Sequence, residues 1–306
     1  MSENDDILES PTLDLDSPVA EPDGPGRFLA EAVQREALST LATTRKRAAA
    51  KNAFTPKAVH QIRVASKRLR ALWQLMRPVI EPQIARDADA RLGGLAAVLS
   101  RSRDIHVMTD LLADLRDSDE PLYRGAFDRA AALLDSPEAV EFDQESTRTA
   151  LLGGLDGDRE EWRLLVLPDD EAIVDPGLAR TYSKTRRRAE TAARTGSGDD
   201  NHRWRKWTKY LRYQLECLGE PGTELRRRIA GLTALGGSLG KRNDLHNLRS
   251  QLEQRNQGNP FGAVFRAIDL RDQALARRVK GVAETLFALS PDEMTATLRR
   301  ELESDN

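Results

Sequence analysis

Apolar residues recur every three or four positions along most of this chain, which is the spacing of amphipathic helices. The pattern is clearest in residues 60–76 and 202–218, which we predict to be two helices of similar design. The apolar side of the first holds Ile62, Leu69, Trp73 and Met76. The apolar side of the second holds Trp204, Trp207, Leu211, Leu215 and Leu218. Each segment therefore has one side suited to a protein core.

The opposite side of both segments is cationic, and its residues match at a displacement of 142 positions: His60 with His202, Arg63 with Arg205, Lys67 with Lys209, and Arg70 with Arg212. Offsets of 0, +3, +7 and +10 fall within an arc of about 80° on a helix. Solvated helix faces usually mix charge signs, because like charges four residues apart repel. The same repulsive spacing in both segments favours a surface that holds a polyanion over a merely solvated face.

A second pair of segments repeats in the same order. LSRSRDIH at 99–106 matches LGKRNDLH at 239–246, with a displacement of 140 positions. Two repeated elements in one order indicate an internal duplication. Arg101 and Lys241 would extend the cationic lining, and we expect Asp104 and Asp244 to pair with arginines of the two motif helices.

Periodicity, prolines and glycines predict the remaining elements. Residues 1–26 are expected to be a disordered acidic tail, followed by an N-terminal bundle (27–156), a connector (157–177) and a C-terminal bundle (178–306). Helices are predicted at 28–50, from Thr55-Pro56 to Pro78, at 83–115, in two parts between 120 and 152, at 177–194, and at about 222–255, 260–287 and 291–303. The connector's apolar residues, Trp162 and 164–167, are expected to pack across the two halves. The helix at 177–194 carries a further cationic face of Arg180, Lys184, Arg187 and Arg188.

The motif pair, H-x-x-R-V-x-x-K-R-L-R and H-x-x-R-K-x-x-K-Y-L-R, resembles the CHAD family, the conserved-histidine α-helical domains that bind inorganic polyphosphate. The resemblance covers about residues 27–306. It implies an all-α fold of two pseudo-symmetric antiparallel helical bundles around a basic central cavity. The polyphosphate-binding residues expected from the motifs and their basic neighbours are His60, Arg63, Lys67, Arg70, Arg101, Lys184, Arg187, Arg188, His202, Arg205, Lys206, Lys209, Arg212 and Lys241.

Composition agrees with a helical, anion-binding protein. Charged residues make up 31% of the chain and aromatic residues 5%. The formal net charge of −2 hides an asymmetry, because residues 1–26 hold eight acids and no Lys or Arg, so the remainder carries +6. The acidic tail could serve solubility alone, or it could compete with the anion for the cationic surface.

Several functional classes are excluded or disfavoured by the residues. With Cys217 as the single cysteine, neither an intrachain disulfide nor a cysteine-based zinc site can form, and we expect a small buried side chain. Phosphate-binding, dinucleotide-binding, zinc-protease and serine-hydrolase motifs are absent. The E-x-E-x-K motif of the catalytic domain that often accompanies CHAD domains is absent too.

We therefore expect a non-catalytic polyphosphate-binding protein with no metal and no cofactor. Nucleic-acid binding is the second hypothesis, and a phosphohydrolase with an unrecognised site is the third. Having no long apolar run, the chain is expected to be soluble and cytoplasmic, with no membrane partner. Association with polyphosphate granules and with polyphosphate-metabolising proteins would fit this function.

Overall fold

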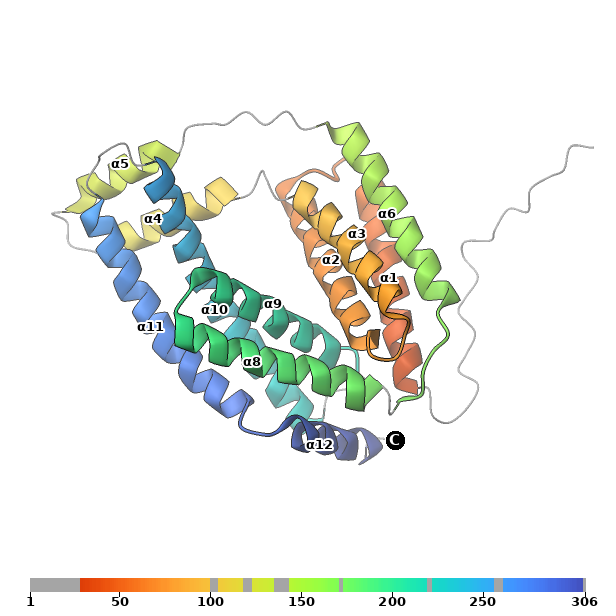
Figure 1. Cartoon of the computed structure of the whole chain (residues 1–306). Coiled ribbons are helices and arrows are strands. Elements are labelled where there is room, and N and C mark those ends of the chain that lie inside the picture. The colour runs from red at the N-terminus through yellow and green to blue at the C-terminus, as the bar shows by residue number, and fades with distance from the viewer. Residues whose placement is uncertain are drawn as a thin grey trace, which may run out of the picture.

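The computed structural model describes residues 28–99, 104–117, 123–134, 143–170, 173–218, 222–255 and 261–304, and within these ranges it contains helices and no strands (Figure 1). The all-α prediction is confirmed. In chain order the helices are α1 (Phe28–Ala49), α2 (Pro56–Met76), α3 (Pro82–Val98), α4 (Asp104–Asp117), α5 (Arg124–Leu134), α6 (Gln144–Leu164), the π-helical turn η2 (Ile173–Leu178), α8 (Ala179–Thr195), α9 (Gly198–Leu215), α10 (Thr223–Arg255), α11 (Gly262–Leu286) and α12 (Pro291–Ser304).

Local sequence signals set several of these boundaries. The Thr55 hydroxyl accepts a hydrogen bond from the Ala58 amide, and Pro56 occupies the first turn of α2. Gly196 ends α8 in the left-handed conformation, with φ of 63°, which a residue with a side chain rarely adopts. These two predicted boundaries are confirmed.

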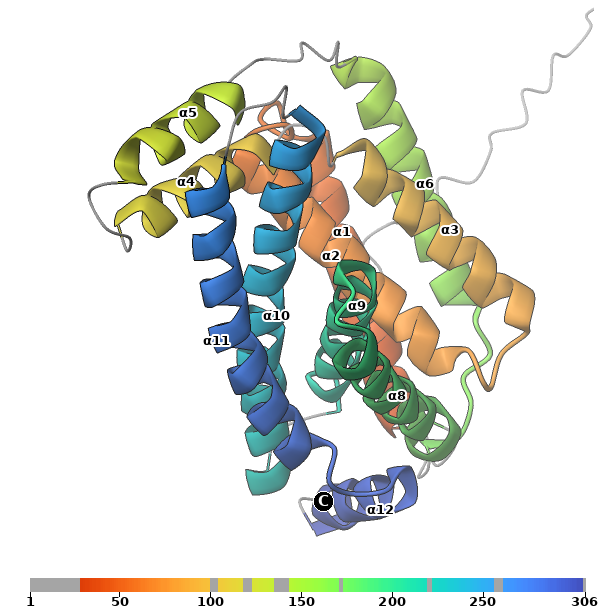
Figure 2. The ribbon, with the colours of Figure 1, turned by 60° about the vertical axis from the view of Figure 1, so that its left-hand side comes forward.

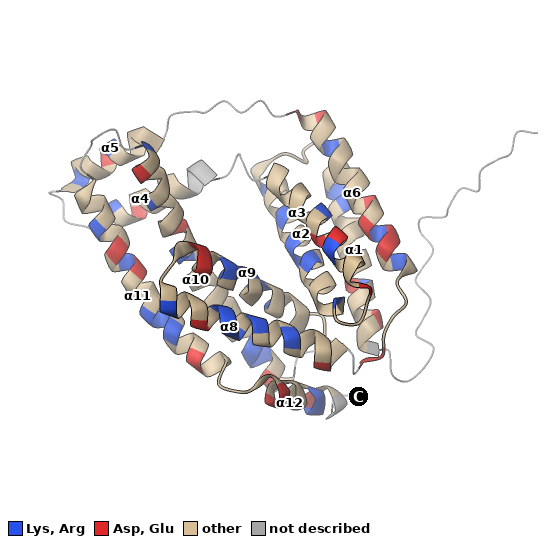
Figure 3. Cartoon of the chain, viewed as in Figure 1, with Lys and Arg blue, Asp and Glu red and all other residues tan. Residues whose placement is uncertain are grey.

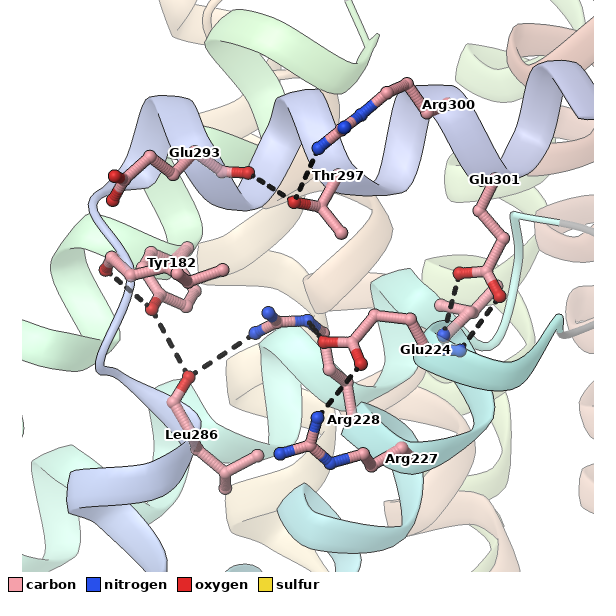
Figure 4. A network of polar contacts seen from close by, with 11 residues as sticks. Tyr182, Glu224, Arg227, Arg228, Leu286, Glu293, Thr297, Arg300 and Glu301 are labelled. Carbon is pink, nitrogen blue, oxygen red and sulfur yellow. Dashed lines mark hydrogen bonds and ion pairs between the residues drawn. The ribbon is translucent and has the colours of Figure 1, made fainter.

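Carboxylates from distant parts of the chain cap two further helices. Asp170 accepts hydrogen bonds from the amides of Leu29 and Ala30 at 2.8 and 3.0 Å, at the start of α1. Glu301 of α12 accepts from the first amides of α10, those of Glu224 and Leu225, at 2.8 and 3.0 Å (Figure 4). A carboxylate at a helix N-terminus satisfies free amides and complements the helix dipole. These contacts tie α12 to α10 and the end of the chain to the fold.

The helices pack in two groups that meet at α2 and α9. Helix α2 packs against α1 and α3, and α6 packs against α1 and α3, whereas α9 lies between α8 and α10 (Figures 1 and 2). Helices α4 and α5, which precede residue 156, pack against α10 and α11 of the second half. A separate apolar cluster forms there, and it includes Leu112, Phe127, Leu248 and Phe261.

The main core contains the apolar side of α2, as predicted. Trp73 is fully buried, and its ring centroid lies 4.1 Å from that of Trp162. The Trp73 indole donates a hydrogen bond to buried Asp158 at 3.0 Å, and Arg91 donates to the same carboxylate at 2.9 Å. Burial raises the pKa of Asp158 to about 6, although Arg91 partly opposes that rise.

The predicted helix at 83–115 is interrupted. Helix α3 ends at Val98 and α4 begins at Asp104, with residues 100–103 outside the described ranges. Helix α3 stays against α2 and α6, whereas α4 packs against α10, α5 and α11. On one continuous helix at about 100° per residue, the buried Met108, Leu112 and Leu115 of α4 would lie about half a turn away from the buried Leu92, Leu95 and Leu99 of α3. This change of phase marks the interruption, and the prediction of a single helix overlooked it. The matching segment at 239–246 lies within the unbroken α10.

The predicted helix end near residues 153–157 is wrong, because α6 continues to Leu164. Gly154 serves close packing instead: a Cβ at this position would lie 2.9 Å from Leu95 Cδ1 of α3. The prediction that Trp162 and residues 164–167 pack across the two halves is wrong for Leu164 and Val166, whereas Leu165 and Leu167 pack against the main core. Leu164 and Val166 are 73% and 85% exposed, whereas Trp162 is buried against Trp73. The predicted break at Ser136-Pro137 and the acidic tail lie outside the described residues.

A basic cavity between two motif helices

Helices α2 and α9 are fixed against each other by a small apolar contact and by buried polar bonds. Ala71 of α2 clusters with Trp207, Tyr210 and Tyr213 of α9. The buried Gln214 amide donates to the Ala71 carbonyl at 2.8 Å. One turn away, Arg68 bridges three helices by binding Glu36 of α1 and Glu216 at the end of α9, each at 2.6 Å. The two motif helices therefore hold their polar sides in a defined relation.

These polar sides line one cavity of about 470 Å³. Helix α2 contributes Arg63, Lys67 and Arg70, and α9 contributes His202, Arg205, Lys206 and Lys209. Figure 3 shows Lys and Arg on both helices and along the adjacent α8. The remaining lining residues are Gly93, Ala96, Ala97, Met108, Tyr210, Asn243, Asp244 and Asn247. The structure thus brings together the central cations of both motifs from segments far apart in the sequence.

The other residues predicted for the site lie elsewhere. His60 and Lys241 are exposed and outside the cavity lining. Arg212 lies one turn past Lys209 and pairs with Glu216 at 3.3 Å. Arg101 is outside the described residues. Lys184, Arg187 and Arg188 belong to α8 and are not part of the lining.

Small and amide-bearing residues of the lining were missed by the sequence reasoning. Gly93 lies against Arg70, where a Cβ would be 3.5 Å from the guanidinium carbon. Gly240 lies against Arg205, where a Cβ would be 3.4 Å from Nε. These glycines leave room for the two guanidinium groups. Asn243 Oδ1 lies 2.8 Å from His202 Nδ1, so α10 also orients the histidine ring. A stripe of small residues on a helix following a cationic motif is the signal that could have identified this wall.

The cationic row of α2 is partly compensated by a carboxylate that the sequence reasoning did not consider. Arg70 donates two hydrogen bonds to Asp89 of α3, at 2.8 and 3.1 Å. Burial alone would raise the pKa of Asp89, but Arg70, Lys206 and Arg77 outweigh burial and lower it. Neither cationic row contains an acid in the sequence, and the carboxylate of Asp89 reaches the α2 row from a neighbouring helix. Asp89 remains ionised and fixes the Arg70 side chain.

Lys209 is the cation most strongly affected by its surroundings. Burial, followed by repulsion from Arg205, Lys67 and Arg212, lowers its pKa to about 7, while Asp244 acts in the opposite direction. The pKa of Lys206 is also lowered, first by burial and then by Arg70. An anion in the cavity would relieve both effects. Asp244 lines the cavity, and its predicted pairing with a motif arginine stays a prediction.

Tyr210 adds an uncharged donor to the cavity. Its side chain is only 2% exposed, and its hydroxyl has no hydrogen-bond partner among the described residues. Burial raises the pKa of Tyr210, so the phenol stays protonated and can donate to an oxyanion. The Tyr210 ring packs edge-on against Trp207, with the two ring centroids 5.4 Å apart.

Other candidate chemistry is limited in the part of the chain that the structure describes. No cluster of three or more His, Cys, Asp or Glu side chains there could hold a metal ion. Cys217 is buried, donates to the Tyr213 carbonyl, and has a pKa raised to about 12 by burial, so it is not a reactive thiolate. No described helix is apolar and long enough for a membrane crossing. The cavity can offer guanidinium, ammonium, imidazole and phenol donors to an oxyanion.

Comparison with known proteins identifies a related family and related folds. The CHAD domain family matches residues 32–253. The crystal structure of the CHAD domain from the plant Ricinus communis superposes with a TM-score of 0.53 at 20% identity, covering 89% of this chain and 96% of that one. PptA from Streptomyces chartreusis superposes with a TM-score of 0.52 at 15% identity, covering 87% and 98%. No curated protein sequence matches the chain.

Proposed function

The chain belongs to the CHAD domain family, and from this premise we propose that it binds inorganic polyphosphate in the cavity between α2 and α9 without catalysing a reaction on it. The observation that carries the proposal is the meeting of two cationic rows in one cavity. Arg63 and Lys67 of α2 lie across from Arg205 and Lys209 of α9. Polyphosphate is a linear polyanion, and its phosphate oxygens match the donors of Arg and Lys.

The electrostatics of the cavity favour a multivalent anion. Like charges held together in a partly buried space repel one another more strongly than they would in water. Burial, and after it repulsion from Arg205, Lys67 and Arg212, lowers the pKa of Lys209. A bound anion would convert repulsion into attraction and release counterions, so affinity should fall steeply with salt. Binding only to the folded state would also stabilise the protein.

Nucleic acid is a poorer fit to this cavity. Base stacking needs accessible aromatic faces, and Trp204, Trp207, Tyr210 and Tyr213 are all at least 91% buried. Polyphosphate presents no bases and needs no such platform. Association with granules or with polyphosphate-metabolising proteins stays a prediction.

The proposal is tested by reversing one charge in each row. Thermal unfolding of the full chain is measured with and without long-chain polyphosphate, for the unmodified protein and for Arg63→Glu together with Arg205→Glu. We expect the unmodified protein to gain stability and the double variant to lose that gain while keeping its helical circular dichroism spectrum.

The matched control is Arg277→Glu together with Arg278→Glu, which makes the same charge change at two exposed residues of α11 outside the cavity lining. This control should retain most of the stabilisation. An equal loss in both variants would mean that net charge alone drives the effect, and full stabilisation of the cavity variant would overturn the site. Mixed-sequence RNA at equal phosphate concentration serves as the competitor; preferential binding of RNA would overturn the choice of ligand.

A further inference from the structure

A second group of cations lies beside the cavity, where the end of α2 meets α8. We call Arg77, Arg180 and Lys184 the α8 track. Each of these side chains is partly exposed, and none forms a salt bridge with a carboxylate among the described residues. Most other arginines near the two motif helices do have such a partner, as Arg68 and Arg70 illustrate. Uncompensated positive charge therefore continues beyond the cavity.

The α8 track is held in place by Trp207 and by the backbone of α2. Lys184 Nζ lies 4.5 Å from the centre of the Trp207 ring, and Arg180 Cζ lies 5.9 Å from it. Both distances are in the range of cation–π attraction. Arg180 also donates to the Gln74 carbonyl at 3.2 Å. The cations are thus positioned without being neutralised, which lowers the entropy lost when an anion binds.

The cations of the α8 track and those of the cavity lie close enough to act on the same carboxylate. Asp89 interacts with Arg70 and Lys206, which line the cavity, and also with Arg77 of the track. Lys206 lines the cavity, and the next residue on α9, Trp207, contacts two cations of the α8 track. Burial and then repulsion from Arg77 lower the pKa of Arg180, and burial followed by Arg180 and Arg77 lowers that of Lys184. Asp89, the carboxylate that acts on Arg77, is hydrogen-bonded to Arg70, and no carboxylate of the described residues pairs with Arg180 or Lys184.

We propose that the α8 track is a second phosphate-binding segment, which receives the part of a polyphosphate chain that extends out of the cavity past Lys206. This inference rests on the proposed function. Once the cavity holds one part of the chain, contact with the track is intramolecular and is favoured by a high effective concentration. A chain confined to the cavity gains nothing from the track. The protein should then discriminate long chains from short ones.

The test compares affinities for tripolyphosphate and for long-chain polyphosphate in the full chain. The track variant is Arg180→Gln together with Lys184→Gln, and the matched control is Arg277→Gln together with Arg278→Gln on α11. We expect the track variant to bind tripolyphosphate as the control does and long chains about tenfold more weakly. The slope of log affinity against log salt for long chains should also become shallower by roughly 1 to 2, as expected for two lost phosphate contacts.

Two outcomes would overturn the inference. One is a track variant whose long-chain affinity and salt slope equal those of the control. The other is an equal loss for tripolyphosphate and for long chains, because that would place the track within the primary site. The salt slope decides the matter even when tripolyphosphate binds too weakly to measure. The proposed function itself would fail only if the unmodified protein bound no long-chain polyphosphate, and this outcome differs from the two that would overturn the track.

Discussion

Replacing Lys209 with arginine should remove most of the pH dependence of polyphosphate binding above about pH 7.5. In the unmodified protein Lys209 faces Arg205 and Arg212 on its own helix, Lys67 on α2 and Asp244 on α10. Burial and the three cations lower its pKa from 10.5 to about 7, so much of the lysine is neutral at that pH. A guanidinium stays charged across the whole range.

The size of this pH dependence follows from the linkage between protonation of Lys209 and binding of the anion. A tenfold change in proton affinity is worth about 1.4 kcal/mol, so charging Lys209 in the protein without its anion costs on the order of 5 kcal/mol more than in water. A bound polyphosphate favours the charged amine and raises its pKa again. Binding at a pH between the free and bound values therefore takes up a proton. The affinity should fall by up to about tenfold for each unit of pH increase in that interval.

The assay is a series of dissociation constants between about pH 7.5 and pH 9, a window in which histidines with an ordinary pKa near 6.5 are mostly neutral. The same titrations run by calorimetry in buffers of different ionisation enthalpy would report the proton uptake directly. We expect a falling affinity in the unmodified protein and a nearly flat one in Lys209→Arg. Any fall that remains in the variant belongs to Lys206 and Lys184, whose pKa values are also lowered. Equal pH profiles for the two proteins would refute the reasoning.

Two further predictions concern stability. Gly157→Ala should stabilise α6 by about 0.5–1 kcal/mol, because a Cβ at this position meets nothing within 4 Å. Gly154→Ala should be less stable than that variant by about 1–2 kcal/mol, because its Cβ would press on Leu95. Equal midpoints of urea unfolding for the two variants would contradict this prediction. Between pH 6 and 4 the raised pKa of Asp158 makes the folded state bind more protons than the unfolded state, so this residue's contribution to stability rises as pH falls, by up to about 3 kcal/mol. Urea unfolding of Asp158→Asn should lack that contribution, and identical pH profiles of the two proteins would exclude it.

Much of the fold was predictable because helix spacing and capping are local properties. The core side of α2, the Thr55-Pro56 start and the glycine end of α8 all follow from a few neighbouring residues. The wrongly predicted end of α6 has its physical origin in tertiary packing. Gly154 resembles a helix terminator in sequence, yet contact with Leu95 of α3 gives it a role inside a helix. No local pattern contains that contact.

The candidate site was likewise predictable only where it depends on local sequence spacing. The repeated spacing of Arg63, Lys67, Arg205 and Lys209 identified the residues that meet in the cavity. The spacing gave no information about Asp89, because its pairing with Arg70 depends on where α3 passes α2. Tyr210 lies on α9 itself, beside the periodic row and outside it, and was not recognised as part of the lining. Side chains that belong to a periodic row can be found from sequence, and the partners that tune them come from other helices.

The two rows match in sequence but do not stand in equal environments, and this inequality bears on how the cavity works. His202 lines the cavity and is oriented by Asn243, whereas His60 is exposed outside the lining. On α2, Arg70 shares its charge with Asp89, so the cavity wall nearest α3 is partly neutralised. On α9, Lys206 and Lys209 both have pKa values lowered by burial and by neighbouring cations. Two lysines of the lining with lowered pKa values therefore lie on α9, the helix that also presents Trp207 to the α8 track. An anion held by this helix would relieve the cavity and reach the track in the same binding event.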